Sequence, residues 1–98
     1  MAKVETRRDF PEKSSAECFK VCLDLVDAAG YKLFKKRDVA NLVISNGTVQ
    51  GNPVDLSTVV PFGSPSSIIV SLASEKLDHI SLTAEVNRIL DLLIKKLA

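Results

Sequence analysis

Two segments whose apolar residues recur with the period of a helix lie near the two ends of the chain, with alternating segments between them. Residues 14–29 place four small or apolar residues on one line, namely Cys18, Cys22, Leu25 and Ala29. Residues 81–97 carry a wider arc of roughly 200°, where a helix on one sheet needs about 100°. That arc consists of Val86, Ile89, Leu90, Leu92, Leu93, Ile94 and Leu97. Helical and alternating periods in one short chain predict an α+β fold.

Local signals mark the ends of both helices. Ser14-Ser15-Ala16-Glu17 fits a capping box, in which the serine hydroxyl accepts from a backbone N–H and the glutamate reaches back. Gly30 supplies a left-handed stop for this first helix. Ser81 is the expected cap of the second helix, which should end near Leu97.

Alternation of polar and apolar residues predicts the strands, over residues 3–10, 31–36, 42–45, 54–60 and 66–73. Lys3, Glu5, Arg7 and Asp9 alternate through the first of these, and Pro11 stops it, which is typical of an edge strand. The segment 66–73 is weakly polar on both faces, so we expect a central strand there.

Glycine, proline and asparagine predict the turns between the strands. Asn46-Gly47 is a strong signal for a two-residue hairpin, with residues 48–50 as the returning arm. Asn52-Pro53 removes a ladder donor and predicts a bend or bulge where the next strand starts. Pro61-Phe62-Gly63-Ser64-Pro65 has the composition of a turn.

The expected architecture is one antiparallel sheet of four to five strands with two amphipathic helices on one face. Its order is strand, helix, three or four strands, helix, and residues 1–98 form a single domain. The chain is 46% hydrophobic and 26% charged, which is ordinary for a globular protein.

The net charge and the N-terminal residues indicate which partners and which cellular location to expect. Thirteen basic and twelve acidic side chains give a net charge of +1, so the overall field favours neither nucleic acid nor an anionic membrane. The first residues contain no apolar h-region, and no apolar run approaches about 18 residues, which predicts a cytoplasmic protein.

The layout resembles two groups of proteins. A short first strand, a helix that ends in Ala28-Ala29-Gly30-Tyr31, an antiparallel meander and a closing helix are similar to the helix-grip superfamily of START and Bet v 1-like proteins. That resemblance implies a long C-terminal helix that closes a curved sheet over an apolar cavity. The same layout resembles a set of small uncharacterised bacterial domains, a likeness that implies no catalytic motif.

Few residues suggest chemistry. Cys18 and Cys22 stand at i, i+4 and could clamp a metal or form a redox pair, but burial as small hydrophobes is the favoured interpretation. His79 follows Asp78, and we interpret it as a solvated loop histidine because no serine nucleophile elbow accompanies it. We therefore expect no catalytic residue, no metal and no cofactor, and no enzymatic activity.

One basic cluster is visible in the sequence. It comprises Lys32, Lys35, Lys36 and Arg37, which Arg7 and Arg8 could join, with Tyr31 and Phe34 interspersed. Such a cluster can hold nucleic acid, but lysine on an outer strand also protects an edge from aggregation. Edge protection is favoured, so we expect no nucleic-acid partner.

Apolar surface left over after the helices pack suggests self-association. If Ile68, Val70 and Leu72 face the helices, then Val59, Ile69 and Ala73 lie on the opposite face of the sheet. Leu92 or Ile94, on the flanks of the second helix, would complete a symmetric interface. We expect a non-catalytic interaction or structural module that forms a homodimer. The alternative is an apolar small molecule held between the sheet and the second helix.

Overall fold

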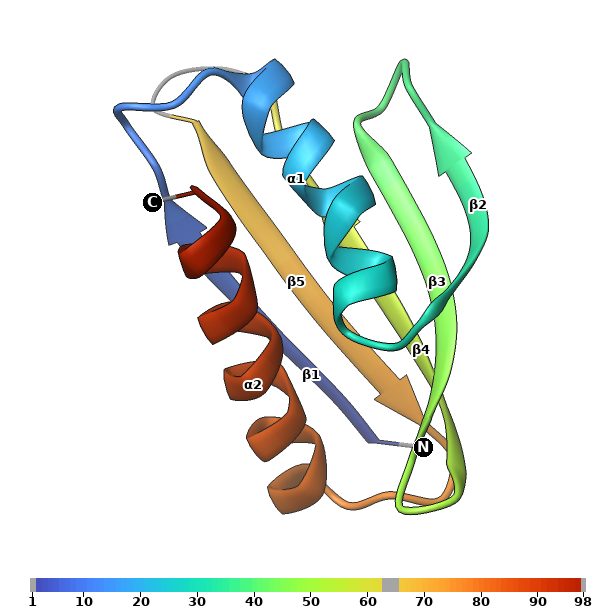
Figure 1. Ribbon diagram of the computed structural model, residues 1–98. Coiled ribbons are helices and arrows are strands. Elements are labelled where there is room, and N and C mark those ends of the chain that lie inside the picture. Colours follow the sequence, from blue (N-terminus) through green and yellow to red (C-terminus); the bar gives the residue numbers. More distant parts are fainter. Residues whose placement is uncertain (1, 63–65, 98) are drawn as a thin grey trace.

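The computed structural model describes residues 2–62 and 66–97, which form one five-stranded antiparallel sheet and two helices (Figure 1). The strand order across the sheet is β1-β5-β4-β3-β2. The elements are β1 (Ala2–Asp9), α1 (Ser15–Ala28), β2 (Lys32–Arg37), β3 (Leu42–Val49), β4 (Asn52–Val59), β5 (Ser67–Ser74) and α2 (His79–Leu97). The predicted α+β class and the predicted order of elements are confirmed.

The first helix begins and ends where the sequence predicts. Ser14 is the N-cap, and its hydroxyl oxygen accepts from the Glu17 N–H at 3.1 Å. The glutamate carboxylate does not reach the backbone; it accepts from the Ser14 hydroxyl at 3.3 Å. Gly30 follows the C-cap Ala29 with a φ of +83°. This turn directs Tyr31, whose N–H donates to Val26 O at 2.8 Å, back onto the helix end.

The hairpin predicted at Asn46-Gly47 is wrong. Both residues lie inside β3, opposite Asp55 and Val54 of β4. The chain turns instead at Gln50 and Gly51, whose φ angles are +54° and +78°, as a two-residue type I′ hairpin requires. Gly47 is needed for another reason, since the Tyr31 ring packs on its backbone and leaves no room for a Cβ.

The bulge expected near Asn52-Pro53 is also absent, because β3 and β4 pair without a register shift from Val49 and Asn52 onwards. Pro53 lies two residues before Asp55, where pairing with β5 begins, so its missing N–H costs no ladder hydrogen bond. The irregularity of the sheet lies in β2, between Leu33 and Lys35.

The remaining strands follow the predictions. As predicted, β1 is an edge strand, with β2 at the other edge, and β5 is central, paired with β1 on one side and β4 on the other. In the turn predicted over residues 61–65, residues 63–65 lie outside the described part of the chain, while Pro61 is half-buried and Phe62 is exposed.

The second helix starts earlier than predicted. It begins at His79, and the Asp78 carboxylate caps it by accepting from the Ser81 N–H at 2.8 Å. Ser81 is therefore the residue that donates to the cap rather than the cap itself. His79 lies in the first turn of the helix, and not in a loop, but it is exposed as expected.

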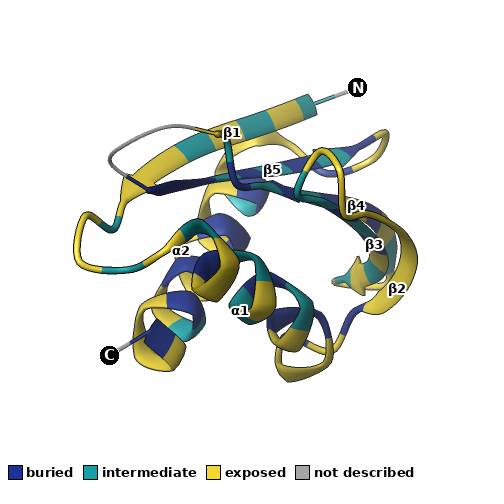
Figure 2. Ribbon diagram, turned by 90° about the horizontal axis from the view of Figure 1, so that it is seen from above, coloured by how far each residue is buried: buried dark blue, intermediate teal, exposed yellow. Residues whose placement is uncertain are grey.

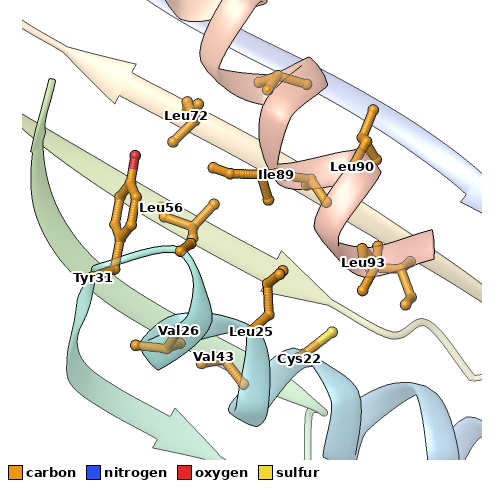
Figure 3. Close-up of a cluster of buried hydrophobic side chains, with 14 of the residues drawn as sticks. Cys22, Leu25, Val26, Tyr31, Val43, Leu56, Leu72, Ile89, Leu90 and Leu93 are labelled. Atoms are coloured by element: carbon orange, nitrogen blue, oxygen red, sulfur yellow. The ribbon is translucent and has the colours of Figure 1, made fainter. Parts of the chain in front are cut away.

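One hydrophobic core fills the space between the helices and the sheet. The sheet bends round both helices, so the buried positions of its strands face inward (Figure 2). Ile68, Val70 and Leu72 of β5 are fully buried there, as predicted. Leu25 and Cys22 of α1 meet the α2 side chains over this surface (Figure 3). In the part of the chain that the structure describes, no helix is both long and apolar enough to span a membrane.

Candidate interaction surface

The face of the sheet opposite the helices, here called the open face, carries a short aliphatic strip. Arg7, Ile69, Val59, Leu42 and Arg37 stand opposite one another across all five strands. The three central side chains of this row are half-buried, although no helix or strand among residues 2–62 and 66–97 packs on them. An arginine ends the row on each edge strand, so the row has an apolar centre and a charged rim.

Two further rows run parallel to the first. Glu5, Ser71, Ser57, Ile44 and Lys35 form the second row, and Lys3, Ala73, Asp55, Asn46 and Lys32 form the third. Ile44 extends the aliphatic strip by one residue. The side-chain amide of Asn46 is oriented so that its nitrogen faces acceptors and its oxygen faces donors. In this orientation the nitrogen donates to the Asp55 carboxylate at 2.8 Å. The open face therefore changes from aliphatic to polar along the strands.

The structure brings together only some of the residues proposed as an interface. Val59 and Ile69 are direct cross-strand partners on the open face, and Ala73 lies on the same face two rows away. Leu92 is partly buried against the core on the other side of the sheet. Ile94 is also on that side, and 47% of its surface is exposed. Leu92 and Ile94 thus cannot belong to one continuous surface with Val59.

Sequence reasoning missed Leu42 and Ile44, which complete the strip. The erroneous hairpin ended the strand at Ser45 and hid the full length of β3, which has 8 residues, so its register with β4 could not be derived. The register follows once the turn is placed at Gln50-Gly51, because Val49 then pairs with Asn52.

The basic cluster is divided by the fold. Lys32, Lys35, Lys36 and Arg37 lie on β2, at one edge of the sheet, while Arg7 and Arg8 lie on β1 at the other edge. Three strands separate them, so Arg7 and Arg8 do not join this cluster. The interspersed aromatics also separate, since Tyr31 is buried and Phe34 is exposed.

A partly buried ionisable cluster that the sequence analysis does not predict lies between the end of α1 and the middle of α2. The Tyr31 hydroxyl donates to Glu85 Oε2 at 2.7 Å. Arg88 donates to both oxygens of the same carboxylate, at 2.8 Å and 2.7 Å, and to Ala29 O at 3.0 Å. A signal was present in the sequence, because Glu85 falls within the apolar arc of the helix, between Leu82 and Ile89.

The groups of this cluster shift one another's pKa. Burial opposes the charged form of Glu85, but hydrogen bonds from Arg88 and Tyr31, and the guanidinium charge, hold the pKa of the carboxyl below its ordinary value. Burial and the adjacent carboxylate raise the pKa of the Tyr31 hydroxyl. The groups satisfy one another and join α1 to α2, so the cluster has a structural role.

The other residues considered for chemistry fall on two separate elements, the cysteines on α1 and Asp78 and His79 at the start of α2. Cys18 and Cys22 are free and buried, and burial raises the pKa of both thiols, that of Cys22 to about 12. Among the described residues, no three His, Cys, Asp or Glu side chains gather closely enough to hold a metal ion. His79 and Asp78 are exposed at the start of α2.

A groove lies at the other end of α2. It has a volume of about 250 Å³ and is lined by Phe10 and Pro11 after β1 and by Ile94 and Leu97 of the helix, with Asp9, Glu12 and Lys13 at its margin. This volume is below the roughly 300–1,000 Å³ of most small-molecule pockets.

Comparison with known proteins gives little further information. No protein-family model and no curated protein sequence matches the chain. A solved structure, the crystal structure of TTHA0849 from Thermus thermophilus, is 9% identical, with a TM-score of 0.46. The match covers 98% of this chain and 94% of that chain.

Proposed function

We propose that this domain is a non-catalytic interaction module that self-associates through the open face of its sheet. The observation that carries the proposal is the contact of Ile69, Val59 and Leu42 in one cross-strand row, on a face that no described element covers. A continuous group of aliphatic side chains on an uncovered sheet face can pack against another protein.

The surroundings of the strip support this proposal. Arginines at both ends of the first row give an apolar centre with a charged rim, as in many protein interfaces. The second row contributes Ser57 and Ser71, whose small side chains allow another sheet to approach closely. Two such faces can stack as the layers of a sandwich, related by a two-fold axis.

A binding site for an apolar small molecule is the second candidate, and the groove beside Ile94 and Leu97 is the observation in its favour. The space between the sheet and α2 is less suitable, because Leu72, Ile89 and Leu93 are fully buried within it (Figure 3). An enzymatic role has weaker support, since the buried Tyr31 and Glu85 and the half-exposed Arg88 are engaged with one another.

Light scattering coupled to size exclusion tests the proposal. We expect the wild type to have twice the 10.6 kDa chain mass at micromolar concentration, and Ile69→Lys to be a folded monomer. Ile94→Lys is the matched control, because it makes the same change on exposed surface away from the open face. It should remain dimeric.

Three results would contradict the proposal. One is a wild type that stays monomeric at several hundred micromolar, and another is an Ile69→Lys protein that remains dimeric. The third is dissociation by Ile94→Lys instead, which would move the interface to α2. Native mass spectrometry of the same samples would reveal an apolar molecule that copurifies, the outcome expected for the second candidate.

A further inference from the structure

Positive charge is concentrated on β2 more strongly than the net charge suggests. Four of the thirteen basic side chains lie in its six residues, so the rest of the chain carries nine basic and twelve acidic side chains. All six β2 residues are exposed. Lys36 lies 3.7 Å from the Asp38 carboxylate, and the other three basic residues make no salt bridge within the described residues.

The outer edge of β2 also presents free backbone groups. Val60 N–H donates to Asn41 O, so odd-numbered residues of β3 direct their backbone groups to β4 and even-numbered ones to β2. Leu42 and Ile44 therefore bond to Arg37 and Lys35. Lys36, between them, directs its N–H and C=O away from the sheet.

The side chains of β2 are basic on the open face, and two large apolar side chains are exposed elsewhere on the strand. Lys32, Lys35 and Arg37 pair with open-face residues of β3, so they project on the open face. Leu33, which pairs with the buried Ser45, and Phe34 at the irregularity are 48% and 69% exposed. Lysines alone would protect an edge from pairing, but protection does not require two large exposed apolar side chains.

We propose that β2 binds an extended, acidic segment of a partner protein as a sixth strand of the sheet. This site differs from the self-association surface because it uses the free backbone groups along the outer edge of β2, although Lys35 and Arg37 also border the open face. A second copy of β2 does not fit, since like charges would stand opposite one another. An acidic strand fits, because alternate carboxylates would meet Lys35 and Arg37 while the intervening apolar side chains contact Leu33.

A model peptide tests the charge requirement. The probe is a fluorescein-labelled ten-residue peptide of alternating glutamate and valine, with both ends blocked, and binding is followed by anisotropy at low ionic strength. Replacing both Lys35 and Arg37 by glutamate should weaken binding at least about tenfold. Replacing both Lys95 and Lys96, two exposed residues at the end of α2, by glutamate makes the same change in net charge. That control should bind within about twofold of wild type.

A second pair of variants separates strand addition from charge attraction alone. Lys36→Pro removes the outward N–H and leaves the hydrogen bonds to β3, whereas Lys36→Gln removes the same charge and keeps the N–H. Lys36→Pro should bind about tenfold more weakly than Lys36→Gln. Hydrogen exchange on the wild type is a further readout that needs no folded variant, and the Lys36 amide should exchange more slowly when the peptide is bound.

Several outcomes would overturn the proposal. They are no binding of the peptide by the wild type, equal binding by the two Lys36 variants when both are folded, or unchanged exchange at Lys36 in the complex. Tighter binding of a labelled twenty-nucleotide thymidine oligomer than of the peptide would assign the strand to nucleic acid instead. The two proposals can fail separately, because the dimer test changes Ile69 of β5, while the Lys36 variants leave the open face unaltered, since Lys36 pairs with the buried Val43.

Discussion

The ring of Tyr31 packs directly on the backbone of Gly47, so that a Cβ built on the glycine would lie 2.8 Å from Tyr31 Cδ2. Tyr31 is held there from both ends. Its N–H bonds to the end of α1 and its hydroxyl bonds to Glu85 of α2. The ring therefore cannot move aside without breaking a contact with one of the helices.

Gly47→Ala should destabilise the protein by about 2 kcal/mol, because the new methyl group displaces a ring that is fixed at both ends. Gly51→Ala is the comparison, since its Cβ would meet nothing within 4 Å but its φ of +78° strains any L side chain. That strain costs about 1 kcal/mol. In urea unfolding, the free energy of unfolding of Gly47→Ala should be lower than that of Gly51→Ala. The reverse order would show that the Tyr31 ring is free to move.

The same contact explains what the sequence could and could not predict. The helices and most strand positions follow from the period of their apolar residues, which requires no knowledge of distant contacts. Asn46-Gly47 has the composition of a turn, but glycine is required there because the ring of Tyr31, sixteen residues away, packs on its backbone. The turn forms instead at Gln50-Gly51. Alternation also predicts that Val59 and Ile69 share one face of the sheet, and the two residues are cross-strand partners there. Leu42 and Ile44 were missed because one wrong turn removes the register of an entire strand.

Capping of α2 gives a second contrast. Asp78→Ala should cost about 1 kcal/mol, since the carboxylate is the acceptor for the Ser81 N–H at the start of the helix. Ser81→Ala keeps that backbone donor and should change the free energy of unfolding by less than about 0.5 kcal/mol. Thermal unfolding of both variants decides between them, and a larger loss in Ser81→Ala would restore Ser81 as the cap.

Glu85 should make stability depend on pH in the acid range. Its pKa in the folded protein lies below the ordinary value, so its contribution is present above the unfolded pKa of about 4.3. The contribution is lost as the pH falls through the folded pKa. Glu85→Gln should therefore be less stable at pH 7 and lose less stability than wild type between pH 6 and pH 3. Glu12→Gln, at an exposed site, should keep the wild-type profile in urea unfolding.

The thiol of Cys22 should be nearly unreactive while the protein is folded. The residue is 1% exposed, and burial raises its pKa to about 12 from the ordinary 9.0. At pH 8 a rise of this size lowers the thiolate fraction about a thousandfold, and only the thiolate attacks a disulfide reagent. In a Cys18→Ala protein, which isolates Cys22, modification by an aromatic disulfide should be slow in buffer and complete within seconds in guanidinium. Rapid modification of the folded protein would show that α1 detaches readily from the sheet, and that the core beneath it is open to small molecules.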